Sequence, residues 1–364
     1  MSKKIIYHLY PGYRGGVAMV IKELTKRLSI KGFKINIITS DTPNNELFEL
    51  EKYGVTLLPT KFYTIREAYF FPSFKFVKYI KSIRNSIVHI HGYHTLASFF
   101  SLLFIDKKTN LVIFQPYFHG RSGNKIRNLL LKFYRYIFNA CINKIDTYIF
   151  ISHYEKANFR RHFFIGDNKI YVIPSGFDFE ELLRHKWKKR SAQVKNILYV
   201  GRIVEHKNVD KLIKALIYLD KDVRLTIIGK GPKSEEIKYL IEKLKVKNRI
   251  KWISYLPREK LLQEYSKADL FVLPSTYESF GLVIGEAALI GCPVIVASSQ
   301  ALKQFVDHKI AYGIEPPITS KKIYEAIVSM KLVSPRKRAI KYFKDWNDVV
   351  SMLVTKVYYE SRDK

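Results

Sequence analysis

Two glutamates eight residues apart lie in the part of the sequence that is richest in groups able to bind a ligand. Glu278 and Glu286 flank Gly281 in the segment PSTYESFGLVIGE. The apolar run Asp269–Leu273 predicts a strand before this segment, and the residues from Leu282 onward predict a helix. Unpaired backbone N–H groups and the helix dipole favour a phosphate at a helix start, which is where Gly281 falls. Both acids could face one ligand without sharing a proton, with Glu278 free to accept hydrogen bonds from sugar hydroxyls. From spacing alone, a loop glycine with two solvated glutamates explains the pattern equally well.

The elements that would position these residues follow a regular alternation along the chain. The predicted strands of the first half are apolar on both faces, as buried parallel strands are, and they are Lys4–Leu9, Ile35–Thr39, Val88–His91, Leu111–Gln115 and Thr147–Ser152. A basic, loop-like stretch at Arg184–Lys195 follows, and then come strands at Asn196–Val200, Arg224–Ile228, Arg249–Ile253, Leu270–Leu273 and Val294–Ala297. Helical patterns separate the strands, at Val17–Lys31, Arg127–Asn143, Val209–Tyr218, Ser234–Leu244, Lys260–Lys267 and Leu282–Ile290. Two such series predict two doubly wound α/β domains facing each other across a cleft, which is a ligand site by default.

The spacing of Glu278 and Glu286 is the Glu-x7-Glu signature of retaining GT-B glycosyltransferases. The surrounding segment ADLFVLPSTYESFGLVIGEAALIGCPVI closely resembles glycosyltransferase family 4, the glycosyl transferases group 1. Further segments resemble the family in the same order: PGYRGG (11–16), FHG (118–120), VIPSGFD (172–178), VGRIVEHKNVDKLIKAL (200–216) and LTIIGKGP (225–232). The resemblance covers almost the whole chain. It implies the GT-B fold, with an acceptor-side Rossmann-like domain at 1–185, a donor-binding domain at 186–344 and a C-terminal helix at 345–364 that returns to the first domain.

The resemblance also implies roles for individual residues. Arg202 and Lys207 would neutralise the negative charge that develops on a departing diphosphate. Glu278 would hold hydroxyls of the donor sugar and Glu286 the ribose, while His119 lies in relatives beside the donor sugar near the reacting carbon. The remaining donor contacts would come from a glycine-rich loop and from the start of a helix, where backbone can approach phosphate: Gly15, Gly16, Phe280, Gly281 and Leu282.

The activity implied is retaining, metal-independent transfer of a sugar from a nucleotide diphosphate to a hydroxyl of a glycan or a lipid-linked acceptor. No cofactor is expected. No carboxylate is an obvious nucleophile, which favours attack on the same face with the leaving phosphate as base. The alternatives are another GT-B nucleotide-sugar enzyme, such as an epimerase or a phosphorylase, and an inactive relative that binds membranes or nucleic acid. Intact Arg202, Lys207 and Glu278 argue against an inactive relative, and no nucleic-acid motif supports a nucleic-acid partner.

Two other patterns resemble metal sites. Asp220-Lys-Asp222 has the form of a metal-binding Asp-x-Asp, but it precedes a predicted strand, where acidic residues are ordinary turn formers. His89, His91 and His94 have metal-like spacing, but no carboxylate or cysteine nearby completes a set. We therefore expect no metal at either place and expect His91 to help shape the acceptor side.

The sequence departs from the family at two places. Gln304 lies about where the family has an acid, and Ser254 replaces a glycine near where relatives hold the nucleobase. Neither residue is among those assigned to the diphosphate. The two changes therefore bear on the choice of base and sugar.

The composition points to an anionic partner. The 364 residues carry 63 Lys plus Arg against 32 Asp plus Glu, a formal net charge of +31. Lys61–Arg84 and Gly123–Lys144 mix cations with aromatic residues, a combination that suits the interface of an anionic membrane and also an ordinary domain face over a core stripe. The only cysteines, Cys141 and Cys292, fit free thiols in a reducing compartment. With no signal peptide or spanning segment evident, we expect a cytoplasmic protein that binds the membrane peripherally.

Overall fold

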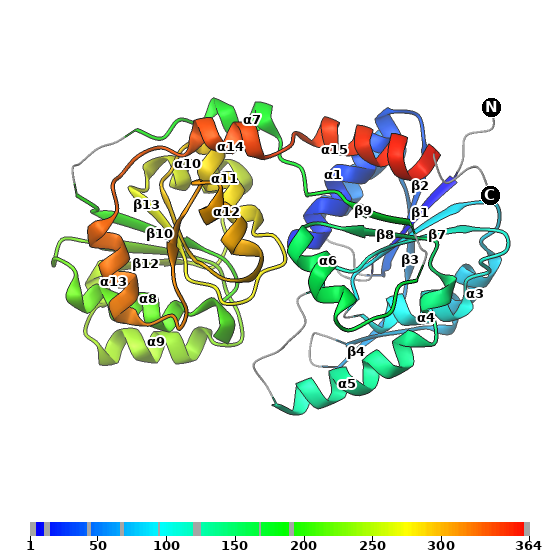
Figure 1. Ribbon diagram of the computed structural model, residues 1–364, viewed down its shortest axis with the longest axis horizontal. Coiled ribbons are helices and arrows are strands. Elements are labelled where there is room, and N and C mark those ends of the chain that lie inside the picture. The colour runs from blue at the N-terminus through cyan, green and yellow to red at the C-terminus, as the bar shows by residue number, and fades with distance from the viewer. Residues whose placement is uncertain are drawn as a thin grey trace. The chain divides into compact units, whose positions relative to one another are not determined.

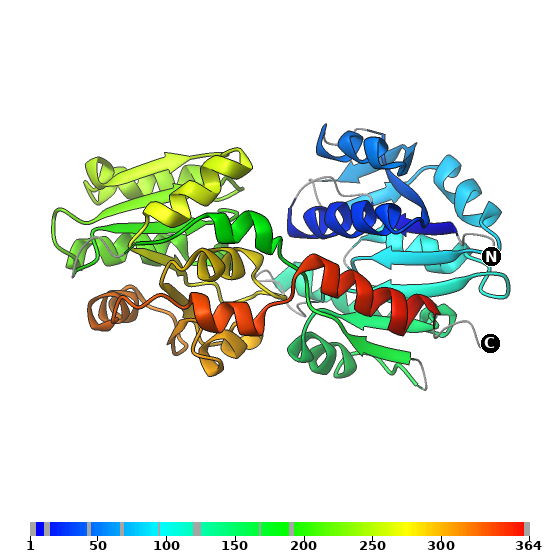
Figure 2. The same ribbon diagram turned by 90° about the horizontal axis from the view of Figure 1, so that it is seen from above.

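The computed structural model describes residues 5–10, 15–41, 45–65, 69–93, 95–118, 125–166, 169–188 and 193–359. The chain divides into two compact units (Figures 1 and 2). The first unit contains the residues up to Gly176 together with those from Trp346 onward, and the second unit is Phe177–Asp345. Each unit has a parallel sheet with helical crossovers, so the predicted pair of doubly wound α/β domains is confirmed.

The first unit is built on a seven-stranded sheet in the order β3-β2-β1-β6-β7-β8-β9. Its strands are β1 (Ile5–Leu9), β2 (Lys34–Ser40), β3 (Thr56–Thr60), β6 (Ile87–His91), β7 (Leu111–Gln115), β8 (Thr147–Phe150) and β9 (Lys169–Val172). All neighbours pair in parallel. The central strands β6, β7 and β8 are almost wholly buried, which explains why they read as continuous apolar runs.

Helices connect these strands. They are α1 (Gly16–Ile30), α2 (Asn45–Phe48), α3 (Phe74–Ser82), α4 (Leu96–Phe104), α5 (Lys125–Asn139) and α6 (His153–Arg160). A separate antiparallel hairpin, β4 (Phe62–Ile65) with β5 (Tyr69–Pro72), precedes α3. The C-terminal helix α15 (Trp346–Leu353) and the π-helical turn Val354–Tyr359 belong to this unit, and α15 packs on α1 (Figure 2).

The second unit is built on a six-stranded sheet in the order β12-β11-β10-β13-β14-β15. Its strands are β10 (Asn196–Val200), β11 (Arg224–Ile228), β12 (Ile250–Ile253), β13 (Leu270–Leu273), β14 (Val294–Ala297) and β15 (Tyr312–Ile314). Its helices are α7 (Phe179–Arg184), α8 (Val209–Ala215), α9 (Ser234–Lys243), α10 (Arg258–Lys267), α11 (Leu282–Ile290), α12 (Lys303–Asp307), α13 (Ser320–Ser329) and α14 (Arg336–Tyr342). Helix α11 is buried along almost its whole length, which explains its uniformly apolar sequence.

The boundary between the units lies nine residues before the sequence-based boundary at residue 185. Helix α7 packs on α11, and the Trp187 indole N–H donates to the Ala268 carbonyl at 2.8 Å. These contacts place the first part of the predicted linker within the second unit. Among the described residues, no helix is long and apolar enough to cross a membrane.

The strand order reverses once in each sheet, and this positions the candidate site. In the first unit the reversal lies between β1 and β6, and in the second between β10 and β13. Loops that leave the carboxyl ends of two such strands diverge in opposite directions, and the space beside them is the usual binding place of open α/β sheets. The predicted residues Gly15 and Gly16 follow β1, while the Arg202 and Glu278 segments follow β10 and β13.

Candidate active site

Two hydrogen-bonded loops form the candidate site in the second unit. The loop after β10 contains a short 3-10 helix, Glu205–Lys207, and the loop after β13 runs from Pro274 to Gly281. The Thr276 backbone N–H donates to the His206 carbonyl at 2.9 Å, and the Asn208 side-chain amide donates to the Pro274 carbonyl at 2.7 Å. Because Asn208 is buried, its hydrogen bond to Pro274 is shielded from water and holds the two loops together.

The Lys207 ammonium and the Glu278 carboxylate form an ion pair across these loops. Each side chain is 14% exposed, so both charges lie in a partly dehydrated place while still reaching solvent. At such a place an ion pair is stronger than on the open surface, because less water screens it. The structure thus brings together two of the residues that the sequence singles out.

Arg202 lies in the same loop and is exposed. Its backbone is held by the buried Tyr199, whose hydroxyl donates to the Arg202 carbonyl at 3.0 Å. Burial and the nearby Glu278 charge raise the pKa of Tyr199 well above its usual value, so the hydroxyl keeps its proton and remains a donor. Arg202 therefore offers an exposed guanidinium on a backbone that Tyr199 holds in place.

The predicted helix start at Gly281 is confirmed. Gly281 is the N-cap of α11 with φ +89°, a left-handed conformation, and a Cβ there would lie 2.8 Å from Ile284 Cδ1. Leu282 is the first residue of the helix and is half-buried. The first turn carries no acidic side chain that would compete with an anionic ligand for the helix dipole.

Phe280 differs from the other candidates because its side chain belongs to the core. It is 5% exposed and packs in an aromatic cluster with Phe177, Phe305 and Phe343, at ring-centroid distances of 6.3, 6.0 and 6.5 Å. The backbone of Phe280 is the part that remains to contact a ligand. The ring anchors the loop that carries Glu278 and Gly281.

Glu286 does not share a partner with Glu278. Its side chain is 4% exposed, its Oε1 pairs with the Arg258 guanidinium, and its Oε2 accepts a hydrogen bond from the Tyr265 hydroxyl at 3.1 Å. Burial and the Glu286 charge raise the pKa of Tyr265 well above its usual value. Neither Arg258 nor Tyr265 is evident as a partner of Glu286 from the sequence, because both come from a different helix, α10.

The glycine-rich candidates lie in the first unit. Gly15 is the N-cap of α1 with φ +95°, Gly16 is the first residue of that helix, and both are exposed. The positive φ explains a glycine at position 15. His119 lies outside the residues that the structure describes.

The Asp-x-Asp alternative lies at the amino end of β11. Asp222 forms an ion pair with Lys195, and the Asp220 carbonyl accepts a hydrogen bond from Arg249 at 2.7 Å. The Val223 backbone N–H donates to the Asp220 carbonyl at 3.0 Å, so this segment forms the turn that the sequence predicts.

In the candidate histidine metal site, His8 takes the third place that the sequence pattern assigns to His94. His8 of β1 lies in register with His89 of β6, and the described residues contain one candidate metal-binding group, formed by His8, His89 and His91. His94 lies outside the described residues. His8 Nδ1 lies 2.9 Å from His91 Nε2, and His89 Nδ1 lies 3.1 Å from the Tyr358 hydroxyl.

All three histidines are fully buried, which controls their ionisation. Burial lowers the pKa of His8 to about 3. Burial, together with the neighbouring histidines, lowers the pKa of His89 and His91 well below the ordinary value, against a small opposing effect of Gln115 on His89. The three rings are therefore neutral at pH 7.

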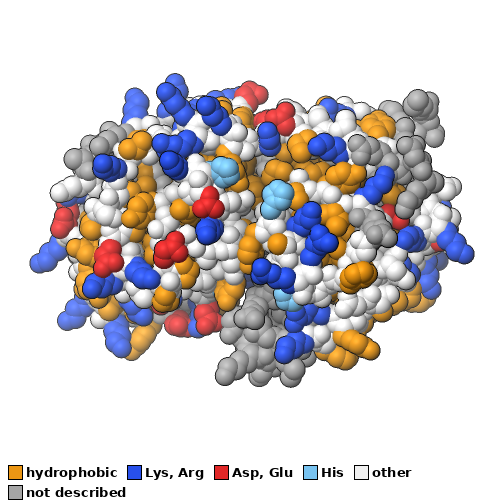
Figure 3. Space-filling model, viewed as in Figure 1, with side chains coloured by type: hydrophobic (Ala, Val, Ile, Leu, Met, Phe, Trp, Pro, Cys, Tyr) orange, Lys and Arg blue, Asp and Glu red, His pale blue; other side chains and the backbone are white. Residues whose placement is uncertain are grey.

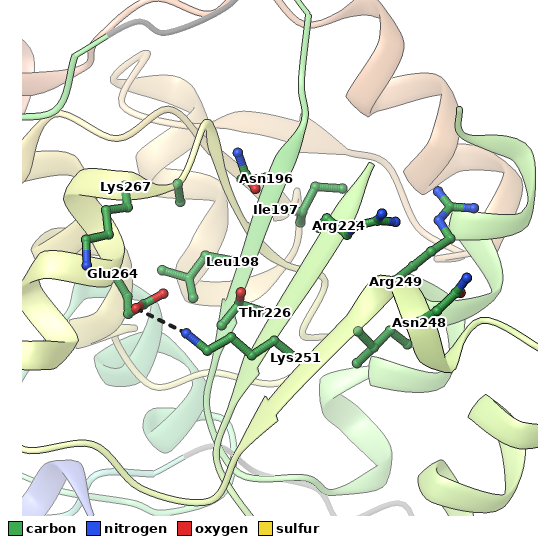
Figure 4. Close-up of a pocket in the computed structure, with 12 residues that line it drawn as sticks. Asn196, Ile197, Leu198, Arg224, Thr226, Asn248, Arg249, Lys251, Glu264 and Lys267 are labelled. Carbon is green, nitrogen blue, oxygen red and sulfur yellow. Dashed lines mark ion pairs between the residues drawn. The ribbon is translucent and has the colours of Figure 1, made fainter. Parts of the chain in front are cut away.

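A separate pocket of about 470 Å³ lies at the amino-terminal ends of the strands of the second sheet, away from the candidate site (Figure 4). It is lined by the first residues of three parallel strands, Asn196, Arg224 and Ile250, and on another side by Glu264 and Lys267 of α10. The Glu264 carboxylate and the Lys251 ammonium are 3.6 Å apart within it. Because the candidate residues follow the carboxyl ends of the strands, this pocket is distinct from the candidate site.

The two departures from the family pattern also lie in the second unit. Ser254, directly after β12, is exposed. The side-chain oxygen of Gln304 accepts a hydrogen bond from the Tyr342 hydroxyl at 2.8 Å. Its buried Nε2 has no hydrogen-bond partner among the residues that the structure describes. Gln304 is therefore built into the packing of α12 against α14.

Comparisons with known proteins identify the family of the chain. The sequence profile described as Glycosyltransferase Family 4 matches residues 14–181, and the profile described as Glycosyl transferases group 1 matches residues 183–346. An uncharacterized glycosyltransferase of Haemophilus influenzae is 24% identical over 85% of this chain and 84% of its own length. The gpi3 subunit of the Schizosaccharomyces pombe phosphatidylinositol N-acetylglucosaminyltransferase is 24% identical over 77% of this chain, which spans 62% of that protein.

Solved structures share the fold at low sequence identity. A sucrose-phosphate synthase from Thermosynechococcus elongatus superposes with a TM-score of 0.78, 18% identity and 99% coverage of both chains. The Anabaena protein HepE, solved with UDP and glucose, superposes with a TM-score of 0.74 and 17% identity over 98% of this chain and 99% of its own. Since the two profiles together span nearly the whole chain, the protein belongs to glycosyltransferase family 4 and is a nucleotide-sugar glycosyltransferase of the GT-B type.

Proposed function

We propose that this protein transfers a sugar from a nucleoside diphosphate to an acceptor hydroxyl with retention of configuration and without a metal ion. The observation that carries the proposal is the Lys207–Glu278 pair on the two loops where the strand order of the second sheet reverses. There the Lys207 ammonium, which can bind a diphosphate, lies beside the Glu278 carboxylate, which can accept hydrogen bonds from sugar hydroxyls. HepE, solved with UDP and glucose, has the same fold.

The chain's own residues can supply what the leaving group needs. When the bond between the anomeric carbon and the phosphate oxygen breaks, the bonding electrons stay on the diphosphate. Lys207, Arg202 and the start of α11 at Gly281 offer two positive charges and a helix dipole to that charge. A metal ion would otherwise have to perform this task, and this is the physical basis for expecting none.

Retention follows in this proposal from attack on the face that the diphosphate leaves. The acceptor oxygen bonds to the anomeric carbon, and its proton passes to the phosphate oxygen that has just been freed. A double displacement would need a carboxylate as nucleophile, but Glu278 is paired with Lys207, and Glu286 is buried between Arg258 and Tyr265. Glu278 then acts by holding the donor sugar.

Proton NMR of the reaction tests this proposal. The enzyme is given α-linked nucleotide sugars and an acceptor or, failing that, water, and the first anomer formed is recorded before mutarotation. We expect the α anomer. The β anomer would overturn retention, an epimerised nucleotide sugar would favour an epimerase, and release of a sugar 1-phosphate would favour a phosphorylase.

We further propose that the acceptor is reached at an anionic membrane. The surface concerned, called here the α3–α5 face, comprises the β4–β5 hairpin, α3, α4 and α5, which pack side by side. Its exposed aromatic side chains are Phe74 (86% exposed), Tyr136 (79%), Phe133 (66%), Tyr63 (54%) and Phe71 (40%). They stand beside exposed Lys75, Lys78, Lys81 and Lys132. Neither α3 nor α5 contains an acidic residue.

Such a surface combines the two attractions that hold a protein at a lipid interface. Lysines are drawn to anionic headgroups, and exposed rings enter the boundary between headgroups and acyl chains. Lysines and arginines are scattered over the visible surface of both units (Figure 3), so charge alone does not distinguish this face. The exposed rings on these neighbouring elements add an apolar attraction to that charge. One relative is the gpi3 subunit of a phosphatidylinositol N-acetylglucosaminyltransferase, and the phosphatidylinositol in that name supports the proposal of a lipid acceptor.

A further inference from the structure

Three helices of the second unit meet around the Glu286 carboxylate. Arg258 and Tyr265 lie seven residues apart on one face of α10, Glu286 lies on α11, and Glu181 lies on α7. Both α7 and α10 pack on α11. The sequence separations of 77 residues between Glu181 and Arg258 and of 28 between Arg258 and Glu286 hide this arrangement from sequence reasoning.

Arg258 bridges two carboxylates. Its Nε donates to both oxygens of Glu181, at 3.2 and 3.1 Å, and its Nη2 donates to Glu181 Oε2 at 2.9 Å. This fork fixes the plane of the guanidinium and leaves Nη1 to pair with Glu286. Although burial disfavours its charged form, the Glu286 and Glu181 charges raise the pKa of Arg258 above its usual value.

These contacts fix the Glu286 carboxylate but leave it able to accept further hydrogen bonds. Arg258 occupies one lone pair of Oε1, and Tyr265 occupies one lone pair of Oε2. A carboxylate offers about four acceptor positions, so one remains on each oxygen. Because the side chain is 4% exposed, an unpaired Glu286 would carry a large desolvation cost, which Arg258 offsets.

We propose that Arg258, held by Glu181, is a positioning residue for the nucleotide: it aims the remaining lone pairs of Glu286 at hydroxyls of the donor ribose. This inference rests on the proposed function and on the ribose contact that the family resemblance implies for Glu286. It adds that ribose recognition depends on a residue that does not touch the ribose. Glu180, next to Glu181, points elsewhere and pairs with Arg184, so the two neighbouring glutamates of α7 have different tasks.

Calorimetric titration of the whole protein tests the proposal. UDP, GDP, ADP and CDP are titrated first, and the best ligand is compared with its 2′-deoxy and 3′-deoxy forms. We expect the wild type to lose about 10-fold or more in affinity when the recognised hydroxyl is removed, as for a hydrogen bond to a charged group. In Arg258→Gln and in Glu181→Gln this discrimination should largely vanish.

The controls separate positioning from general damage. Arg224→Gln and Glu180→Gln change an exposed arginine and an exposed glutamate of the same unit and should keep the wild-type discrimination. In a Glu286→Gln background, Arg258→Gln should have little further effect on the hydroxyl preference. Glu181→Gln keeps the side-chain volume, so it remains informative if Arg258→Gln does not fold.

The outcomes are distinguishable. If both variants lose affinity equally for the nucleotide and its deoxy forms, or keep the full discrimination, Arg258 does not position Glu286 for ribose and the inference is wrong. If the wild type binds none of the four nucleotides, the inference fails, and if it does not bind dTDP either, the proposed function fails with it.

Discussion

Lys207 and Glu278 form an ion pair between loops that follow two adjacent strands, β10 and β13, and each side chain keeps 14% of its surface exposed. The pair holds a cation and an anion ready where a sugar diphosphate would need both. In the free protein each charge stabilises the other. A bound donor would take over part of this interaction, with its phosphates beside Lys207 and its hydroxyls beside Glu278.

Removal of Lys207 should therefore weaken catalysis more than removal of an ordinary surface lysine. We expect Lys207→Ala and Arg202→Ala each to lose about 2–5 kcal/mol of donor binding or transition-state stabilisation, read from kcat/KM for the donor. Lys243→Ala, an exposed lysine at the end of α9, is the matched control. Turnover within threefold of the wild type in both variants would contradict the assignment.

Metal removal should leave transfer intact. Lys207, Arg202 and the α11 start supply the positive charge in this account, and Asp222 is already paired with Lys195. We expect the rate in excess EDTA to equal the rate in added Mg²⁺ or Mn²⁺. A rate that disappears in EDTA and returns with added metal would show that a metal ion takes part, with the His8, His89 and His91 group as the first place to examine.

The α3–α5 face should bind anionic vesicles. Changing Lys75, Lys78 and Lys81 to glutamate should release the protein from phosphatidylglycerol-containing vesicles, since each surface cation contributes about 1 kcal/mol. Hydrolysis of a water-soluble donor should stay unchanged. Changing Lys221, Lys243 and Lys337 to glutamate alters the net charge equally on exposed positions of the other unit.

A second variant tests the contribution of the exposed rings to vesicle binding. Phe74→Ser should weaken the part of vesicle binding that persists at high salt, because salt screens charges but leaves apolar contacts unscreened. If both triple variants lose binding equally, the attraction is general to the basic protein. If neither does, the α3–α5 face is an ordinary solvated surface.

Acid should destabilise the first unit. His8, His89 and His91 have folded pKa values below the ordinary 6.5, so below that pH the unfolded chain binds protons that the folded chain does not. Their contribution to stability is complete above pH 6.5 and is lost as the pH falls. Between pH 6.5 and 5 the loss is about 2 kcal/mol for each histidine that stays neutral.

Urea unfolding at pH 7.5 and at pH 5 measures this loss. His8→Leu should reduce the difference in unfolding free energy between the two pH values, whereas His153→Gln, an exposed histidine, should not. An unfolding midpoint that is the same at both pH values would show that the buried histidines bind protons without penalty.

The sequence predicts the central strands well but misses three of the four edge strands of the two main sheets, whereas the fourth, β12, is predicted within one residue. Leu111–Gln115, Asn196–Val200 and Leu270–Leu273 match the observed strands residue for residue, because strands buried on both faces are apolar throughout. β3, β9 and β15 lie at or near sheet edges, are partly exposed and leave a weak pattern. Pro59 within β3 is tolerated there because an edge strand has one unpaired side.

Some residues of the candidate site can be predicted from the sequence and others cannot. Lys207, Glu278 and Gly281 lie in loops directly after recognisable strands, so motifs identify them. Arg258 and Tyr265 cannot, because their relation to Glu286 depends on how α10 packs against α11. His8 joins His89 only because β1 and β6 are neighbours, and strand order is not written in the local pattern.

The most direct test of the central claim is donor turnover by the unmodified protein and two variants. UDP-, GDP-, ADP-, CDP- and dTDP-sugars are incubated without acceptor, and release of the nucleoside diphosphate is followed. We predict slow release from one of these donor classes and its loss in Glu278→Gln, with Glu242→Gln, an exposed glutamate of α9, behaving as wild type. Turnover that is unchanged in Glu278→Gln, or absent with every donor in the wild type, would contradict the claim that this site transfers sugar from a nucleotide.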